Sequence, residues 1–243
     1  MENRSAIIQD RIRQMPESTI FTFADLSDAR VSPQALAVVI SRLVKQGVLQ
    51  RLSKGRYGKP RKSRFGTLLP PDGQVLESIL RSKAGQLTGY VSGISAYNRM
   101  GLTTQVPSEI TLVSSSSSRQ SKIGKLRIRF VRSNSVITEE TKELLPLLDA
   151  LRDVKKIPDS STDEVVVKLR AKIGALGTAE KIALSEAAIL YAPRVRALLG
   201  AIFESSGEPT LANAQKSTLN ALSTFTIGVS KSALQNIENW NIR

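Results

Sequence analysis

The sequence predicts an α+β fold in three parts, and three observations support it. Helical and strand-like spacings of apolar residues alternate over residues 1–66. Two helices and two strands are indicated over 67–135, and only helical spacing is found over 136–243. We therefore expect an N-terminal domain (1–66), a small mixed α/β domain (67–135) and a mainly α-helical C-terminal domain (136–243).

The elements of residues 1–66 follow from periodicity, prolines and glycines. Pro16 ends the first helix, Ser32 and Pro33 give a capped helix start, and Gly47 suits the left-handed end of that helix. In chain order we expect a helix (4–15), a strand (19–23), a brief helix (24–29), a helix (32–46), strands (48–52 and 56–59) and a basic linker (61–64). This order is typical of a winged helix-turn-helix.

The helix over 32–46 has one apolar and one polar face when its residues are placed 100° apart. The apolar face, which we expect to pack against Ile8, Ile12 and the strand near Phe23, comprises Leu36, Val39, Ile40 and Leu43. On the other face Gln34 can pair with adenine, Ala37 can touch a thymine methyl group, and Ser41 can donate or accept a hydrogen bond. The predicted base contacts are Ser32, Gln34, Ala37, Val38, Ser41, Arg42 and Lys45.

A run of cations follows this helix, with no acidic residue among them. The predicted phosphate contacts, seven within fourteen positions, are Arg51, Lys54, Arg56, Lys59, Arg61, Lys62 and Arg64. Such contacts position a protein on a duplex but do not specify its sequence. Tyr57 either stacks on a sugar or fills the core beneath the hairpin, and we favour the core. The alternative to DNA binding is a small helical domain with a solvated basic hairpin.

The whole chain has a net charge of +14, and its excess of cations is confined to the first 135 residues. Lys and Arg outnumber Asp and Glu by 13 to 5 over residues 1–66 and by 9 to 3 over 67–135. The two kinds balance at 13 each over 136–243. A segregated excess indicates a polyanionic partner, for which we favour nucleic acid over an acidic protein or a membrane surface.

A second basic face is predicted in the middle segment. Lys125, Arg127 and Arg129 alternate with apolar residues, so a strand over 125–131 would place the three cations on one side. This face is either ordinary solvated surface or a second anion-binding surface for DNA flanks or RNA. The other expected elements are helices (73–83 and 92–100), a strand (109–114) and a mobile polar loop (114–118).

Residues 136–243 are predicted to be helical. One helix is expected to begin at 138. Further helices are expected at 161–176, 178–191, 193–204, 216–222 and 230–237. The acidic pairs at 139–140 and 163–164 suit helix N-termini, where the helix dipole favours negative charge. In the middle segment Asp72, Glu77 and Glu109 are dispersed, which disfavours a metal-dependent RNA-processing enzyme.

The composition argues against catalysis and against a cofactor. The 243 residues are 41% apolar and include neither cysteine nor histidine. Disulfides, thiolate metal sites and the commonest general base are therefore absent. We expect a cytoplasmic protein that is no enzyme and binds no metal or cofactor. A membrane partner is not expected, since no apolar run approaches the roughly 18 residues of a membrane span.

Several segments are similar to one known family. They are SRLVKQGVLQRLSKGRYGKP, then GYVSGISAYNRMGLTTQVPSEITLVS with LRIRFV soon after, and APRVRALLGAIFE with a final WNIR. Together they resemble the AbiEi-like antitoxins of type IV toxin–antitoxin systems, in a mainly uncharacterised branch. The resemblance covers essentially the whole chain.

The resemblance implies a winged helix that represses its own operon by binding its operator. It also implies a C-terminal region that opposes a nucleotidyltransferase-like toxin without a stable complex. The chain does not resemble the toxin half, because cations and not paired acids follow its serine run. The alternative is a winged-helix transcriptional regulator without a toxin partner. A homodimer on a palindromic operator is left open by the sequence.

Overall fold

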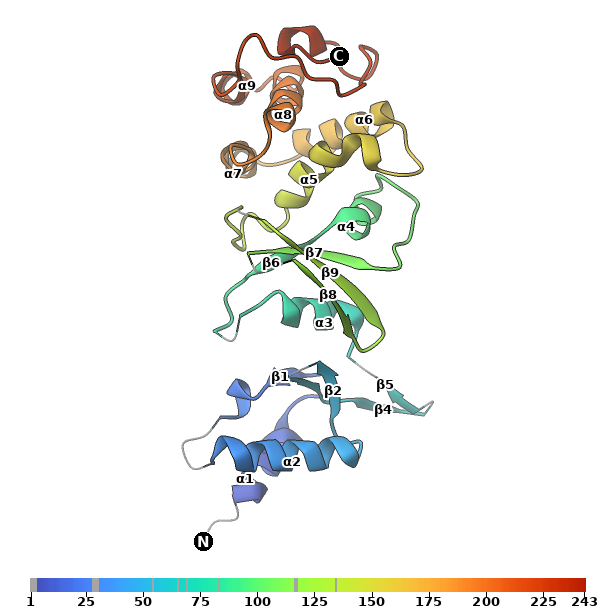
Figure 1. The fold of residues 1–243 in the computed structure, drawn as a ribbon, viewed down its shortest axis with the longest axis vertical. Coiled ribbons are helices and arrows are strands. Elements are labelled where there is room, and N and C mark those ends of the chain that lie inside the picture. Colours follow the sequence, from blue (N-terminus) through green and yellow to red (C-terminus); the bar gives the residue numbers. More distant parts are fainter. Residues whose placement is uncertain are drawn as a thin grey trace. The chain divides into compact units, whose positions relative to one another are not determined.

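The computed structural model forms two compact units (Figure 1). It describes residues 4–27, 31–53, 55–64, 66–68, 70–82, 84–115, 118–133 and 135–243, except the side chains of Arg4, Ser5, Lys62 and Thr67. Unit 1 comprises Met1–Gln86 and Lys122–Arg127, and unit 2 comprises Leu87–Ser121 and Ile128–Arg243. The fold is α+β, as predicted. The segment 67–135 is divided between the two units and does not stand alone.

Unit 1 begins with helices and short strands in the order that periodicity predicted. Its elements are α1 (Arg4–Gln14), β1 (Ile20–Thr22), the 3-10 helix η1 (Ala24–Leu26), α2 (Pro33–Lys45), β2 (Gln50–Ser53), β3 (Arg56–Gly58), β4 (Arg61–Ser63), β5 (Gly66–Leu68) and α3 (Asp72–Ile79). The strands β1, β3 and β2 form an antiparallel sheet in that order. The end of the predicted brief helix, at 28–29, lies outside the described residues.

The core of unit 1 lies between α1, α2 and the three-stranded sheet. As predicted, Leu36, Val39, Ile40 and Leu43 of α2 are buried in one cluster with Ile8 and Ile12 of α1. Tyr57 is also buried there, with its ring centroid 6.0 Å from that of Phe21 and 5.4 Å from that of Phe23. The prediction that Tyr57 fills the core is therefore confirmed. Gly47 has the expected left-handed conformation, with φ of 71°.

The predicted basic linker at 61–64 was wrong, because this segment forms an antiparallel hairpin of β4 and β5. Arg61 pairs with Leu68 and Ser63 with Gly66. The Ser63 Oγ donates a hydrogen bond to the Gly66 carbonyl oxygen at 2.8 Å. Gly66 has φ of 114°, a conformation that residues with a Cβ rarely adopt. The glycine therefore allows the chain to reverse where we expected a linker.

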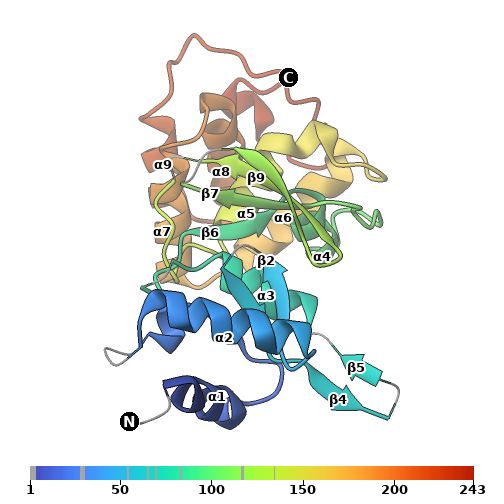
Figure 2. The same ribbon diagram turned by 60° about the horizontal axis from the view of Figure 1, so that its bottom comes forward.

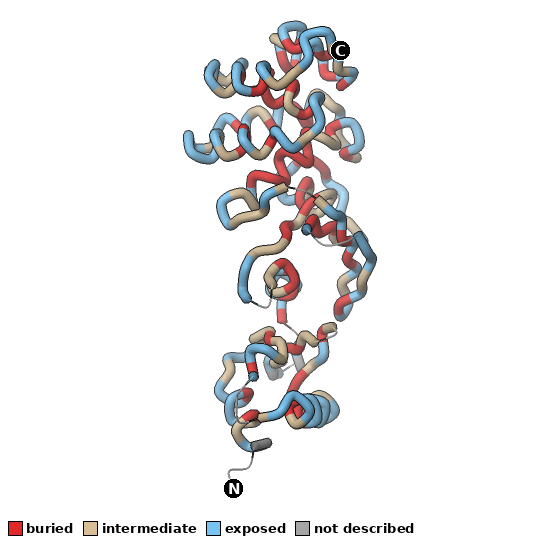
Figure 3. Tube along the Cα trace, turned by 60° about the vertical axis from the view of Figure 1, so that its left-hand side comes forward, coloured by how far each residue is buried: buried red, intermediate tan, exposed pale blue. Residues whose placement is uncertain are grey.

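Unit 2 combines a sheet with a group of helices. Its elements are β6 (Gly89–Ser92), α4 (Gly93–Arg99), β7 (Ile110–Ser114), β8 (Arg119–Ile123), β9 (Leu126–Arg132), α5 (Leu145–Asp153), η2 (Val154–Lys156), α6 (Thr162–Gly174), α7 (Thr178–Ala188), α8 (Pro193–Ser205), α9 (Pro209–Lys216) and η3 (Ile237–Trp240). The ends of β8 and β9 that join in the hairpin turn belong to unit 1. The sheet order is β6-β7-β9-β8, with β7 parallel to β9. Buried positions run along the inner sides of the helices (Figure 3), and Leu145–Leu151 of α5 is buried throughout.

Two of the segments that carry the family resemblance pack against each other in unit 2. Trp240 lies so close to α8 that a side chain at Gly200 would overlap its ring. The Trp240 Nε1 donates to the Glu204 carboxylate at 2.9 Å, and Lys216 lies over the Trp240 ring, 5.4 Å from its centroid. APRVRALLGAIFE and WNIR are therefore two sides of one packing contact.

The predictions for three of the C-terminal helices were wrong. The helix expected at 216–222 is displaced toward the N-terminus, because Pro209 begins α9 and that helix ends at Lys216. The segment 230–237 forms turns, and its Ser230 hydroxyl donates to Asp163 at 2.6 Å. The helix expected from 138 begins only at Leu145, after turns held by hydrogen bonds between Thr138 and Thr141. The strands β6 and β8 were not predicted. Within the loop expected at 114–118, Ser116 and Ser117 lie outside the described residues.

Candidate nucleic-acid interface

The face of α2 opposite the core is exposed along the whole helix. Gln34, Ala37, Val38, Ser41, Arg42 and Lys45 are all exposed, and the Val38 side chain is 69% exposed. The six residues recur three or four positions apart, which places them on one side of the helix. All the predicted base contacts except Ser32 therefore share one solvent-facing surface, which we call the α2 face.

Ser32 lies at the start of this helix and acts as its N-cap. Its Oγ accepts a hydrogen bond from the Ala35 backbone N–H at 3.3 Å, and the residue is exposed. A capping hydroxyl satisfies one of the backbone donors that the first turn leaves unpaired. The predicted base contact at Ser32 is thus also a structural residue of α2.

The charges of the α2 face are confined to one end. No charged residue occurs from Ser32 to Ser41, and Arg42 and Lys45 lie in the last turn. The cations suit this end, because the helix dipole is negative there. The α2 face is therefore neutral over its first three turns and basic at its C-terminus.

Three cations of the predicted phosphate-contacting run are exposed on strands and turns after α2. Arg51 lies on β2, Arg61 on β4, and Arg64 in the turn before β5. Two views place the β4–β5 hairpin on the side of unit 1 where α2 ends (Figure 1, Figure 2). Lys54 and the side chain of Lys62, also predicted as phosphate contacts, lie outside the described residues.

Two of the predicted phosphate contacts are engaged inside the protein. The Arg56 guanidinium is half-buried and donates to the Ser78 carbonyl oxygen at 3.0 Å, and burial lowers the pKa of Arg56. The Lys59 Nζ donates to the carbonyl oxygens of Arg13 and Met15 at 2.7 and 2.5 Å, at the end of α1. We therefore withdraw Arg56 and Lys59 as phosphate contacts and regard them as structural.

The three cations of the predicted second basic face have different surroundings. Lys125 lies in the hairpin turn before β9, not on the strand, and its Nζ lies 3.7 Å from the Asp72 carboxylate. Arg127 is exposed on β9. Arg129 is exposed on the same strand, but its Nε lies 3.2 Å from Glu109 and its Nη2 donates to the Thr111 hydroxyl at 3.2 Å. Of the three, Arg127 is the cation for which the structure gives no such partner.

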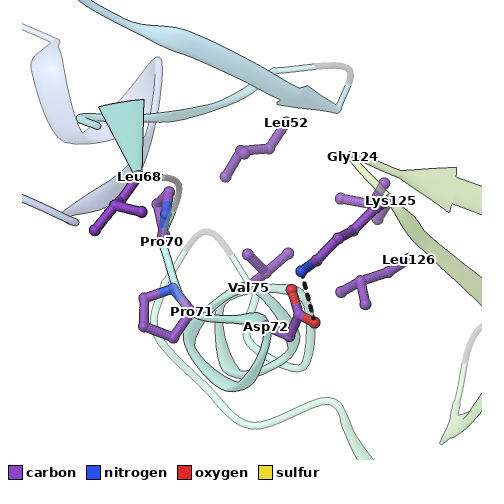
Figure 4. Close-up of a pocket in the computed structure, with 10 residues that line it drawn as sticks. Leu52, Leu68, Pro70, Pro71, Asp72, Val75, Gly124, Lys125 and Leu126 are labelled. Atoms are coloured by element: carbon purple, nitrogen blue, oxygen red, sulfur yellow. Dashed lines mark ion pairs between the residues drawn. The ribbon is translucent and has the colours of Figure 1, made fainter. Parts of the chain in front are cut away.

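A pocket of about 360 Å³ lies within unit 1 (Figure 4). It is lined by Leu52, Leu68, Pro70, Pro71, Asp72, Val75, Ile123, Gly124, Lys125 and Leu126. The walls are apolar, and the one charged pair is that of Lys125 and Asp72. Such a lining offers mainly apolar contact, with one exposed ion pair beside it.

A buried polar cluster lies in unit 2 and was not predicted from the sequence. The carboxylate of Asp149, which is 1% exposed, accepts hydrogen bonds from Tyr90 (3.0 Å), Ser92 (2.5 Å) and Tyr191 (3.1 Å). The Arg152 Nη1 lies 2.6 Å from it. Arg152 also pairs with Asp153 at 2.9 Å. We call this set the Asp149 network.

The electrostatics of the Asp149 network indicate a structural role. Burial raises the pKa of Tyr90 and of Tyr191, and the negative charge of Asp149 is the second cause of this rise. Both phenols therefore stay protonated and act as donors. Burial opposes ionisation of Asp153, but hydrogen bonds from Arg152 and Tyr97 outweigh it and lower the pKa of that carboxyl. Four donors occupy the two oxygens of Asp149. Asp149 therefore serves the fold as a hydrogen-bond acceptor.

A sequence signal for this network was present in the resemblance. Tyr90, Ser92 and Tyr97 all belong to GYVSGISAYNRMGLTTQVPSEITLVS, the most telling of the similar segments. Asp149, the partner of Tyr90 and Ser92, lies between leucines at helical spacing, which suggested a plain apolar helix. Nothing in local spacing links residues more than fifty positions apart, so the pairing was not predictable.

Two more findings concern metal ions and membranes. Within the described ranges, no group of three carboxylates is placed to hold a metal ion. In the part of the chain that the structure describes, every helix is too short or too polar to span a bilayer.

Comparisons with known proteins identify a family and a similar solved structure. A family model described as "Family of unknown function (DUF6088)" matches residues 7–176. The chain is similar to the crystal structure of the RV2827C protein from Mycobacterium tuberculosis, with 16% sequence identity and a TM-score of 0.46. That similarity covers 95% of this chain and 87% of the other. No curated protein matches.

Proposed function

The chain belongs to a family of unknown function (DUF6088), and we propose that it is a sequence-specific DNA-binding protein whose unit 1 is a winged helix-turn-helix. The α2 face carries the proposal. It is a helix surface of exposed small and uncharged residues that ends in two cations, on a helix whose other face is buried in its own core. A helix of this kind fits the major groove of B-DNA, which admits one α-helix.

The order of elements in unit 1 supports the winged-helix interpretation. Two helices and a short strand precede α2, and an antiparallel hairpin of β2 and β3 follows it. In such domains the helix in the position of α2 contacts base edges and the hairpin contacts the backbone. We extend the backbone-contacting part to β4–β5, because Arg61 and Arg64 are exposed there.

The proposal predicts how binding depends on salt. The exposed and described cations of α2 and of the basic run that follows it are Arg42, Lys45, Arg51, Arg61 and Arg64. If all five reach phosphates, log K should fall with log salt at a slope of about −4.5. A mobility-shift titration of the full chain on duplex DNA at several salt concentrations measures this slope. Absence of any shifted complex at low salt would refute the proposal.

Regulation of its own operon and opposition to a toxin form a second layer of the proposal. They are supported by the family resemblance and by the segregated charge, which favours a nucleic-acid partner for the N-terminal part. Footprinting on the upstream region of the gene tests the first. Co-expression with an adjacent nucleotidyltransferase-like gene tests the second: growth should be restored without a co-purified complex. If no such gene lies adjacent, the stand-alone regulator is the better interpretation.

A further inference from the structure

The most exposed large apolar side chain that the structure describes in unit 1 lies in the middle of the α2 face. Val38 is 69% exposed, compared with 43% for both Val48 and Leu68. It follows Gln34 by four residues and precedes Ser41 by three, so it lies on the line of side chains most distant from the core. Among the described residues of unit 1, Val38 therefore lies outside the hydrophobic core cluster.

Arg42 and Lys45 are assigned to phosphates in the proposed function, which leaves base recognition to the neutral part of the α2 face, from Ser32 to Ser41. The residues of this part narrow the bases that it can recognise. Guanine is most often read by arginine or lysine, and cytosine can be read by aspartate or glutamate. None of these residue types occurs from Ser32 to Ser41. The side chains that are present suit an A·T pair: glutamine bonds the N6 and N7 of adenine, and apolar groups contact the thymine C5 methyl.

We propose that α2 selects A·T base pairs and that Val38, aided by Ala37, contacts the C5 methyl group of a thymine. This inference rests on the proposed function, because it names the bases that the proposed recognition helix reads. Val38 lies one turn after Gln34, about 6 Å along the helix axis. Adjacent base pairs are about 3.4 Å apart, so the two side chains reach different base pairs of one short A·T-containing site.

The proposed contact also distinguishes DNA from RNA. Uracil lacks the C5 methyl group, and the major groove of A-form RNA is too narrow for a helix to read. The α2 face should therefore make no methyl contact with an RNA duplex of the same sequence. Duplex RNA serves as a further probe beside deoxyuridine-substituted DNA.

The test uses the full chain and synthetic duplexes. Sites are first selected from a random-sequence duplex library and should be enriched in A·T pairs. Each thymine of a selected site is then replaced by deoxyuridine, which removes the methyl group and keeps the pairing. For the wild-type chain we expect one or two positions at which the substitution weakens binding about fourfold, the equilibrium equivalent of burying one methyl group.

A matched pair of variants assigns the contact to its residue. In Val38→Ala the deoxyuridine penalty should fall below about twofold, whereas affinity for non-specific duplex should be unchanged. Val167→Ala makes the same change at an exposed helical valine of α6 and should keep the full penalty. Neither change should unfold its helix, since alanine has a higher helix propensity than valine, and circular dichroism checks this.

The outcomes separate this inference from the function on which it rests. Selection of G·C-rich sites, or equal affinity for thymine and deoxyuridine at every position, overturns the thymine contact and leaves DNA binding intact. A penalty that persists in Val38→Ala overturns the assignment to Val38. If the full chain binds no DNA duplex at low salt, both the inference and the proposed function are overturned.

Discussion

Unit 1 and unit 2 use the same polar residue types in opposite ways. On the α2 face and the β4–β5 hairpin, glutamine, serine and arginine side chains point into solvent. In the Asp149 network, tyrosine, serine and arginine side chains converge on a buried carboxylate. The first arrangement leaves hydrogen-bonding capacity for a partner, whereas the second uses it within the fold. We therefore propose that unit 1 carries the binding surface and that the polar cluster of unit 2 stabilises the fold.

The same contrast occurs within unit 1. Arg56 and Arg61 are five positions apart in a single basic run. Arg56 is half-buried and donates to a backbone carbonyl of α3, while Arg61 is exposed. A cation with an internal partner has already lost much of its hydration, so its guanidinium supports the fold. A count of the cations in this basic run therefore overstates the number that are free to contact phosphates.

The largest expected effect is on the Asp149 network. Asp149→Ala removes the acceptor of three hydroxyls and of Arg152, so the free energy of unfolding should fall by about 3–5 kcal/mol. Urea unfolding of the full chain measures it. Lys231→Ala, which breaks an exposed ion pair with Glu238, is the control and should cost less than about 1 kcal/mol. At urea concentrations below the unfolding transition, the Asp149→Ala variant should bind DNA as the wild-type chain does. A loss of DNA affinity under these conditions would contradict the separate roles of unit 1 and unit 2.

The next effect concerns base recognition by unit 1. Gln34→Ala should remove about 1–3 kcal/mol of discrimination at one base pair, because a bidentate contact to adenine is lost. Competition binding with single-base variants of a selected site measures this difference. Gln74→Ala changes an exposed glutamine of α3 and should keep the discrimination. Equal losses on every sequence would show that Gln34 contacts no base.

A smaller effect is expected for the phosphate contacts. The double substitution Arg61→Ala and Arg64→Ala should weaken binding to all duplexes and make the salt slope shallower by about two. The matched change at the exposed Lys155 and Lys156 of η2 should leave the slope unaltered. An unchanged slope in the arginine variant would remove β4–β5 from the proposed interface.

The smallest expected effect is a pH dependence of stability from Asp153. Its folded pKa is lowered, so its stabilisation is present above the unfolded pKa and is lost as pH falls through the folded pKa. Arg152 is 41% exposed and solvent screens the pair, so we expect less than about 1 kcal/mol. Unfolding midpoints should therefore decline below about pH 4, and Asp153→Asn should flatten this decline. Glu186→Gln, at an exposed position of α7, should leave the decline as in the wild-type chain.

The sequence by itself determined the local features of unit 1. The spacing of Leu36, Val39, Ile40 and Leu43 set the buried face of α2, and Ser32 and Gly47 set its ends. These features depend on residues within a few positions of one another, and the 3.6-residue period determines which side chains share a face. The composition of the α2 face was readable for the same reason.

The tertiary structure alone decided which polar groups have internal partners. The partners of Lys59 lie 44 and 46 positions away, and those of Asp149 include residues 59, 57 and 42 positions away. Pairing over such distances depends on how the elements pack, which no local period encodes. Burial then fixes the outcome, because a polar group that leaves water must find its partner inside the fold.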